Sequence, residues 1–182
     1  MYFSSFPTTT FDDVTLLDIT RKAKLTSLIK SSALAYMNYT VQEGERPEDV
    51  AFYYYDDPAY AWLVLLSNDI VDPYTQWPKS AQDLEANIIS KYASLANATG
   101  SAVTEWTKSQ TISSNIIHYQ SLNDPNVRLN RASYFNTPLP EFYAVRAYDY
   151  EVELNESRKE IVLINKGFLS TIKDQLKTII NE

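Results

Sequence analysis

The residues best suited to chemistry are few, and the first is His118, the only histidine among 182 residues. A Ser-His-Asp triad or a histidine-ligated metal would depend entirely on it, and no neighbouring catalytic signature accompanies it. The chain has no cysteine, which excludes disulfides, thiolate chemistry and cysteine-ligated zinc. We therefore interpret His118 as a strand histidine in a loop-rich segment rather than a functional one.

A second candidate is the set of acidic residues Asp56, Asp57, Asp69 and Asp72, whose carboxylates could bind calcium. Their spacing lacks the glycine and the terminal glutamate of an EF-hand loop, and helix caps and turns account for each of them. A carboxylate pair for glycoside cleavage is available in any acidic chain, and no pattern here selects one. We predict that the protein is not an enzyme and that it holds no metal and no cofactor.

The composition of the chain disfavours some classes of binding partner. The net charge of -7 repels a phosphate backbone, so we expect no nucleic-acid partner. The longest apolar run, Ala59 to Leu66, is far shorter than the roughly 20 residues of a membrane-spanning helix, and the first residues lack the pattern of a signal peptide. The 14 tyrosines suit partly hydrated protein contacts, although a tyrosine-rich core edge would use them equally well.

The clearest order of elements lies between residues 37 and 96. A strand is expected over 37–41, and Gly44 lets the chain turn into a helix that begins at Arg46-Pro47. Asp57 and Pro58 are expected to begin a second helix. Ser80 with Asp83 forms a capping box for a third, longer helix that ends near residue 97.

The flanking segments are less regular. Residues 1–36 are expected to form an extended arm with a short strand near 14–19 and a short helix near 22–32, and residues 97–140 an irregular arm with occasional strands. Alternation over 142–154, followed by an apolar run at 161–164, predicts a β-hairpin, and a C-terminal helix follows Gly167. The chain is therefore predicted to be α+β, with segments 1–36, 37–96, 97–140 and 141–182.

Two resemblances rest on these residues. Tyr39-Thr40-Val41 with Gly44-Glu45, then helix, break and helix, resembles a LysM domain. More specifically, the chain resembles the small baseplate wedge protein of contractile-tailed bacteriophages, of the gene product fifty-three type. The matching residues are Arg46, Pro47, Glu48, Asp49, Pro58, Tyr60, Trp62, Leu63, Val64, Leu65, Asn68, Asp69, Asp72, Pro73, Tyr74, Trp77 and Ser80. Residues 150–161 and 18–21 agree as well. The family often has glycine at the position of Asp56, and aspartate also tolerates left-handed backbone geometry.

The resemblance implies a structural subunit of the phage tail baseplate, built around a small LysM-like strand-helix-helix domain. Such proteins contact other wedge proteins and inner-baseplate subunits near the hub, and they help to join neighbouring wedges into a multi-copy ring. It implies a place in the virion, with assembly in the host cytoplasm. No catalysis is implied.

Two further expectations concern binding. LysM modules elsewhere bind peptidoglycan or chitin, and the corresponding loops here would be 44–47 and 67–72; the single embedded copy favours protein docking over saccharide binding. An open strand edge in 142–154 or 161–164 is expected to pair with another chain, and the alternative is that the hairpin packs on the core of this protein. The predicted partner-binding residues are Tyr53, Tyr54, Tyr55, Tyr74, Trp77, Tyr148, Tyr150, Glu151, Glu153 and Arg158.

Overall fold

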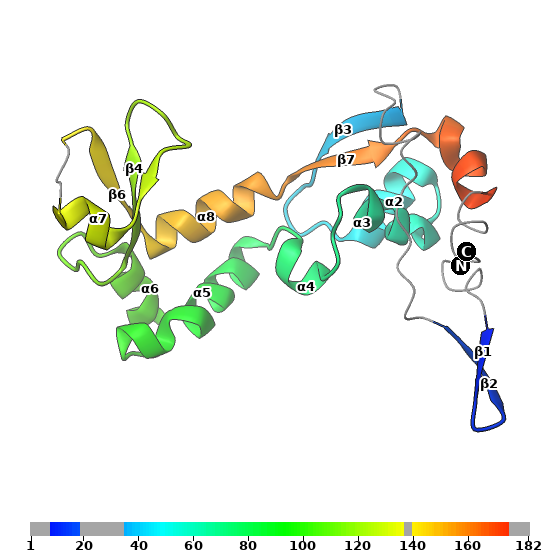
Figure 1. Ribbon diagram of the computed structural model, residues 1–182, viewed down its shortest axis with the longest axis horizontal. Helices are drawn as coiled ribbons and strands as arrows, with labels where there is room; N and C mark the ends of the chain where they lie inside the picture. Colours follow the sequence, from blue (N-terminus) through cyan, green and yellow to red (C-terminus); the bar gives the residue numbers. More distant parts are fainter. Residues whose placement is uncertain (1–7, 19–34, 137–139, 175–182) are drawn as a thin grey trace. The chain divides into compact units, whose positions relative to one another are not determined.

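The computed structural model describes residues 8–18, 35–136 and 140–174, and its class is α+β, as predicted (Figure 1). The chain forms two compact units. Unit 1 comprises residues 1–78 and 158–182, and unit 2 comprises residues 79–157. The four segments predicted from sequence patterns follow the chain order rather than this packing, and they stay a prediction.

Unit 1 is organised by a two-stranded antiparallel sheet whose strands come from distant parts of the chain. Strand β3 (Tyr36–Thr40) pairs with β7 (Glu160–Ile164), from Tyr36 opposite Ile164 to Thr40 opposite Glu160. Between them in sequence come α2 (Pro47–Tyr55), the 3-10 turn η3 (Pro58–Tyr60), α3 (Ala61–Ser67) and α4 (Pro73–Gln76). The order strand, helix, helix, strand is therefore present, with its last strand supplied after unit 2. The LysM likeness itself stays a prediction.

The helix boundaries of unit 1 confirm the capping predictions. Gly44 has φ +75° ahead of α2, whose first residue is Pro47. Asp56 ends α2 in the left-handed conformation, with φ 64°. The Asp57 side chain accepts a hydrogen bond from the Ala59 N–H at 2.8 Å and so begins η3. Each turn is thus encoded locally, by a residue that tolerates positive φ or caps a free N–H.

The core of unit 1 combines the inner faces of these helices with β7 and the C-terminal helix over 169–174, which follows η4 (Lys166–Phe168). Its fully buried side chains are Ala35, Val50, Ala51, Leu63, Val64, Leu163 and Ile164. Ile172 is also buried there, and Phe168 and Leu169 pack against the same cluster. The helix over 169–174 confirms the C-terminal helix predicted after Gly167, and residues 175–182 lie outside the described residues.

Unit 2 pairs helices with a three-stranded antiparallel sheet in the order β5-β4-β6. Its elements are α5 (Ala81–Ala96), α6 (Ser101–Lys108), β4 (Ile116–Ser121), β5 (Arg128–Leu129), α7 (Arg131–Asn136), β6 (Phe142–Arg146) and α8 (Ala147–Ser157). Ser80 caps α5 by accepting from the Asp83 N–H, as predicted. Ile88, Tyr92, Val103 and Ala147 form a buried cluster in which α5, α6 and α8 meet.

The predicted C-terminal hairpin is wrong. Residues 147–157 form helix α8, and β7 pairs with β3 instead of with 142–154. The alternation of tyrosine and valine with acidic residues coexists with a helical spacing, because Ala147, Glu151 and Asn155 are buried at intervals of four. Alanine, glutamate and leucine also favour a helix in this stretch, and that preference together with the buried stripe outweighs a pattern of period two.

The irregular arm predicted over 97–140 is wrong where helices α6 and α7 lie, and the strand expected at 116–119 is present as part of β4. A buried cation organises the loop before β4: Arg146 donates to Gln110, to the Ile112 carbonyl and to Asn115. Asn115 in turn donates to the carbonyls of Trp106 and Ser109 at 2.7 and 2.8 Å. These side-chain hydrogen bonds, rather than regular secondary structure, hold the loop before β4 in place. The sequence of the loop therefore has no periodic pattern.

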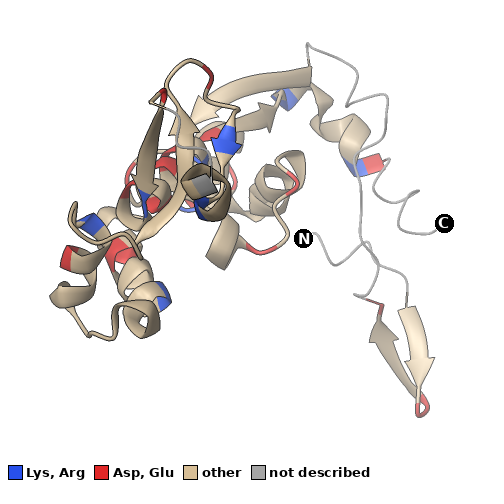
Figure 2. Ribbon diagram, turned by 60° about the vertical axis from the view of Figure 1, so that its left-hand side comes forward, with Lys and Arg blue, Asp and Glu red and all other residues tan. Residues whose placement is uncertain are grey.

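The N-terminal segment contains a second small sheet. Strand β1 (Thr8–Phe11) pairs with β2 (Val14–Leu17) through a turn at Asp12 and Asp13, which both have positive φ. The turn gives the hairpin an acidic tip (Figure 2). The short strand predicted near 14–19 is confirmed at β2, whereas the extended arm before it is partly a strand. The helix predicted near 22–32 lies outside the described residues.

Candidate partner-binding surfaces

Two of the predicted partner-binding residues are core residues of unit 1. Tyr55 is 5% exposed, and its hydroxyl donates to the Ile164 carbonyl at 2.9 Å and accepts from the Ile164 N–H at 3.0 Å. Burial raises the pKa of Tyr55 above its usual value. Trp77 is 7% exposed and donates its indole N–H to the Glu45 carbonyl at 2.8 Å. Both side chains hold unit 1 together, which leaves little of either surface for another protein.

Two others are prominently exposed. Tyr53 is 71% exposed and Tyr74 is 87% exposed, and the neighbouring apolar side chains Phe52 and Val71 are exposed as well. Tyr54 is half-buried, with the Lys166 ammonium 5.7 Å from its ring. We call Phe52, Tyr53, Val71 and Tyr74 the exposed apolar set of unit 1. Large aromatic side chains held in water are the groups that gain most from burial in an interface.

The predicted partner-binding residues of α8 also include side chains that make contacts within their own unit. Glu151 is 4% exposed, and its carboxylate accepts from the Lys91 ammonium at 2.6 Å and from the Tyr92 hydroxyl at 2.8 Å. Burial, with Glu151 as the next cause, raises the pKa of Tyr92. Tyr148 is half-buried, with the Lys108 ammonium 4.1 Å from its ring centre. These two side chains therefore join α8 to α5 and α6.

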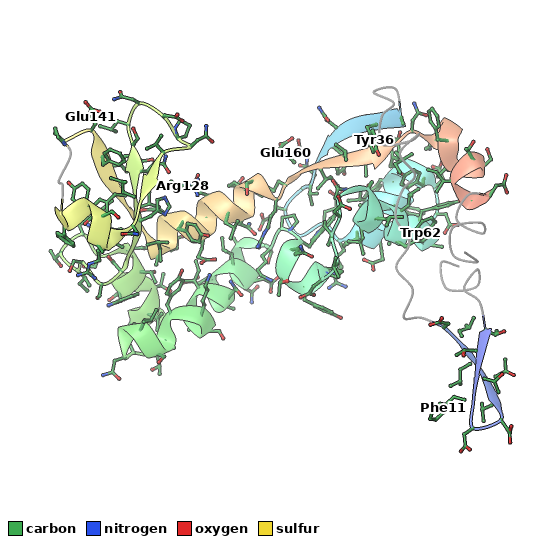
Figure 3. The ribbon with its side chains drawn as sticks, in the orientation of Figure 1. Phe11, Tyr36, Trp62, Arg128, Glu141 and Glu160 are labelled. Carbon is green, nitrogen blue, oxygen red and sulfur yellow. The ribbon has the colours of Figure 1, made fainter. Side chains whose placement is uncertain are left out.

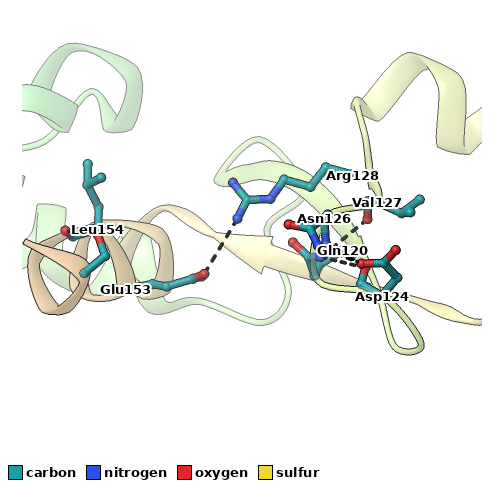
Figure 4. A network of polar contacts seen from close by, with 8 residues as sticks. Gln120, Asp124, Asn126, Val127, Arg128, Glu153 and Leu154 are labelled. Carbon is teal, nitrogen blue, oxygen red and sulfur yellow. Dashed lines mark hydrogen bonds and ion pairs between the residues drawn. The ribbon is translucent and has the colours of Figure 1, made fainter. Parts of the chain in front are cut away.

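Tyr150 and Glu153 line a surface pocket of unit 2, with a cavity volume of about 250 Å³, together with Arg128, Leu154 and Ser157. The Arg128 guanidinium lies 3.8 Å from the Glu153 carboxylate, and Figure 4 shows this pair beside the β4–β5 loop. In that loop Asp124 accepts from the Asn126 N–H at 2.8 Å, which fixes the turn into β5. The pocket thus presents one cation and one anion, both partly hydrated.

His118 lies on β4 and is 8% exposed, with the Tyr150 ring edge-on at a centroid distance of 6.0 Å. Its Nε2 has no hydrogen-bond partner in the described structure. Its place on β4 confirms that it is a strand histidine. Within residues 8–18, 35–136 and 140–174, no group of three or more acidic or histidine side chains could hold a metal ion. None of the helices described is long and apolar enough to span a membrane.

Sequence reasoning missed several surface residues. Phe52, Val71 and Arg128 were not among the predicted contacts, and Arg158, which was, is half-buried. Phe52 could have been found, because helical spacing puts it on the face of α2 opposite Val50. Arg128 could not, since its neighbour Glu153 is 25 residues away and belongs to a segment that the alternation placed in a strand.

Comparison with known protein families identifies a match. Residues 8–179 match the family model described as base plate wedge protein 53. A search of curated proteins finds no match. The family model spans both compact units and nearly the whole sequence. The chain therefore belongs to the base plate wedge protein 53 family, whose members are structural components of the phage tail baseplate.

Proposed function

We propose that this protein is a non-catalytic subunit that joins baseplate wedges into a ring around the hub, and that it is incorporated during assembly in the host cytoplasm. The family match over residues 8–179 carries the proposal. Its partners are other wedge proteins and the inner subunits near the hub. The exposed apolar set supports a role in protein contacts, because Tyr53 and Tyr74 keep most of their surface in water.

The exposed tyrosines are better suited to docking than to stability. Each sits on a short helix whose other residues already fix it in place: α2 through Val50 and Ala51, and α4 through the Asp72 cap, which accepts from the Tyr74 N–H at 3.0 Å. A rigid helix presents an aromatic ring at little entropic cost. Truncating either ring should therefore weaken docking and leave the fold intact.

Reconstitution tests the proposal. Wedges purified from the same phage would be mixed with this protein, and ring formation would be followed by sedimentation. We expect joined wedges only when the protein is present, and we expect Tyr53→Ala with Tyr74→Ala to weaken incorporation by roughly tenfold or more. The double Tyr→Phe variant, which keeps both rings, is the matched control. Equal ring formation without the protein would overturn the joining role.

The saccharide-binding alternative predicts retention on insoluble peptidoglycan. In unit 1 the first of the two candidate loops uses its polar groups internally: Glu45 accepts from the Tyr39 hydroxyl at 2.7 Å and from the Gln42 N–H at 2.9 Å. The Glu45 carbonyl accepts from Trp77. We expect no retention, and retention that disappears on mutating residues 44–47 would favour a sugar-binding module over a structural subunit.

A further inference from the structure

The two edges of the β3–β7 sheet differ in their hydrogen bonding. On the β7 side, Val162 donates to the Asn68 side chain at 2.8 Å and accepts from it at 2.9 Å. Ile164 makes the same kind of paired contact with the Tyr55 hydroxyl. Side chains from α3 and α2 therefore occupy this edge. A strand edge filled in this way cannot accept another strand.

This bonding fixes which backbone groups of β3 face outward. In an antiparallel ladder the N–H and C=O of one residue point to the same side, and the side alternates along the strand. Since Val162 and Ile164 point away from β3, Ile161 and Leu163 point toward it. Their partners in β3 are Tyr39 and Met37. The backbone groups of Tyr36, Asn38 and Thr40 therefore form the outer edge.

The outer edge of β3 is open in the described structure. The Thr40 carbonyl accepts from the Gln42 side chain at 2.8 Å, and no hydrogen bond of the described residues reaches the backbone of Tyr36 or Asn38. The strand has no proline and no charged side chain, and its pairing with β7 has no register shift. It thus lacks the usual devices that protect an edge. Strand β6 differs, because a bulge interrupts its pairing with β4.

We propose that the outer edge of β3 accepts an extended segment of another baseplate protein as a third strand. This inference rests on the proposed function and names the mode of contact. The backbone groups of Tyr36 and Asn38 would bond the incoming strand in the manner of β-strand addition. It also moves the expected strand pairing to a new place, because 161–164 is already paired on one side and occupied on the other.

Charge beside the edge favours a different protein over a second copy. Glu160 lies opposite Thr40, and its carboxylate accepts from the Thr40 hydroxyl at 3.0 Å. Figure 3 shows Tyr36 and Glu160 at opposite ends of this sheet. The chain carries a net charge of -7, so a segment with basic residues fits this edge better than a second copy of the same chain.

The partner segment predicted by this arrangement is uncharged over its central residues and basic at the end that meets Glu160. An uncharged centre matches the side chains of Met37, Asn38 and Tyr39. Lysine or arginine at that end would meet the Glu160 carboxylate.

Two substitutions at one position test the inference. Asn38→Pro removes the outward N–H and keeps the bonds to β7, and proline is tolerated on an edge strand. Asn38→Val changes the same side chain but keeps the backbone donor. Binding to wedge complexes reconstituted from the other wedge proteins would be measured by sedimentation. We expect Asn38→Pro to bind roughly tenfold or more weakly and Asn38→Val to stay within about twofold of the unsubstituted protein.

Hydrogen exchange of the unsubstituted protein is the second measurement, and it does not depend on how a variant folds. The amides of Tyr36 and Asn38 should exchange quickly in the free protein and slowly in the wedge complex. Equal binding by Asn38→Pro, or unchanged exchange at both amides in the complex, would overturn the strand addition while leaving the joining role intact. Failure of the unsubstituted protein to bind wedges would overturn both. Edge protection that appears in the protein alone at high concentration would assign the edge to a second copy.

Discussion

The Asn68 side chain makes the hydrogen bonds that occupy the edge of β7 at Val162. Its amide donates to the Val162 carbonyl at 2.9 Å and to the Val64 carbonyl at 2.8 Å, and its oxygen accepts from the Val162 N–H at 2.8 Å. Asn68→Ala removes all three bonds. The Ser67 hydroxyl still reaches the Val162 carbonyl at 2.9 Å, so the carbonyl keeps one donor and the N–H loses its only partner.

The expected cost follows from these bonds. A typical intramolecular hydrogen bond contributes about 0.5–1.5 kcal/mol, and a buried donor left unpaired costs about 1–3 kcal/mol. Val162 is half-buried, so water recovers part of the loss. We expect Asn68→Ala to lower the free energy of unfolding of unit 1 by about 2–3 kcal/mol. With a urea dependence of about 1–3 kcal/mol per molar, the unfolding midpoint should fall by roughly 1–3 M.

Tryptophan fluorescence provides the assay. Trp62 and Trp77 belong to unit 1 and Trp106 to unit 2, so urea unfolding in a Trp106→Phe background reports on unit 1. Asn68→Asp is the matched variant: it keeps the shape and the acceptor, but it places a carboxylate oxygen against two carbonyls. It should destabilise unit 1 at pH 7 at least as much as alanine does. A loss below about 0.5 kcal/mol for both variants would refute the edge argument, because that is the size of an ordinary surface change.

Three further predictions concern single positions. Burial, followed by the hydrogen bond to Glu45, raises the pKa of Tyr39 to about 12, so Tyr39 ionises at a lower pH in the unfolded chain than in the folded protein. The stability that Tyr39 contributes is therefore complete below pH 10 and is lost as the pH rises toward 12. Tyr39→Phe should flatten that part of a plot of urea midpoint against pH. Asp56→Gly should raise the free energy of unfolding by about 0.5–1 kcal/mol, because glycine has no Cβ to strain at φ 64°, and Asp56→Ala should lower it by a similar amount. Glu151→Ala should destabilise unit 2 by about 2–4 kcal/mol, since it leaves the buried Tyr92 hydroxyl and the Lys91 ammonium without their acceptor. Trp106 fluorescence during urea unfolding would report this loss. An unchanged unfolding midpoint would contradict the buried role of this carboxylate.

The parts of the fold that sequence predicted are those with local signals. Gly44, Pro47, Asp57 and Ser80 each fix a turn or a cap through contacts with residues a few positions away. Helices α2, α3 and α5 follow from such signals and from apolar spacing. Asp56 adopts the left-handed backbone expected of it, although the family often has glycine there.

What the sequence did not predict depends on distant partners. Strand β3 pairs with β7, about 120 positions along the chain, and no local pattern names that partner. Glu151 looks like one of several surface acids until Tyr92 and Lys91 surround it. The buried Arg146 orders a loop that has no periodicity of its own. Residues that make such contacts can be assigned to the core or to the surface only when the fold is known.

The same contacts predict order in unit 2 before assembly. Val103, Thr107 and Asn115 are fully or almost fully buried within the unit, in the segment that sequence patterns predicted to be an irregular arm. Buried hydrogen-bonded segments exchange their amides slowly. We therefore expect strongly protected amides within residues 103–136 and 140–155 of the free protein.

The joining role is tested most directly by the structure of an assembled baseplate from the same phage, determined by electron cryo-microscopy. The account predicts that each copy of this chain contacts two neighbouring wedges, with Tyr53 and Tyr74 covered by other subunits and an added strand along β3. A chain that lies wholly within one wedge, with those tyrosines and the edge of β3 still facing solvent, would contradict it.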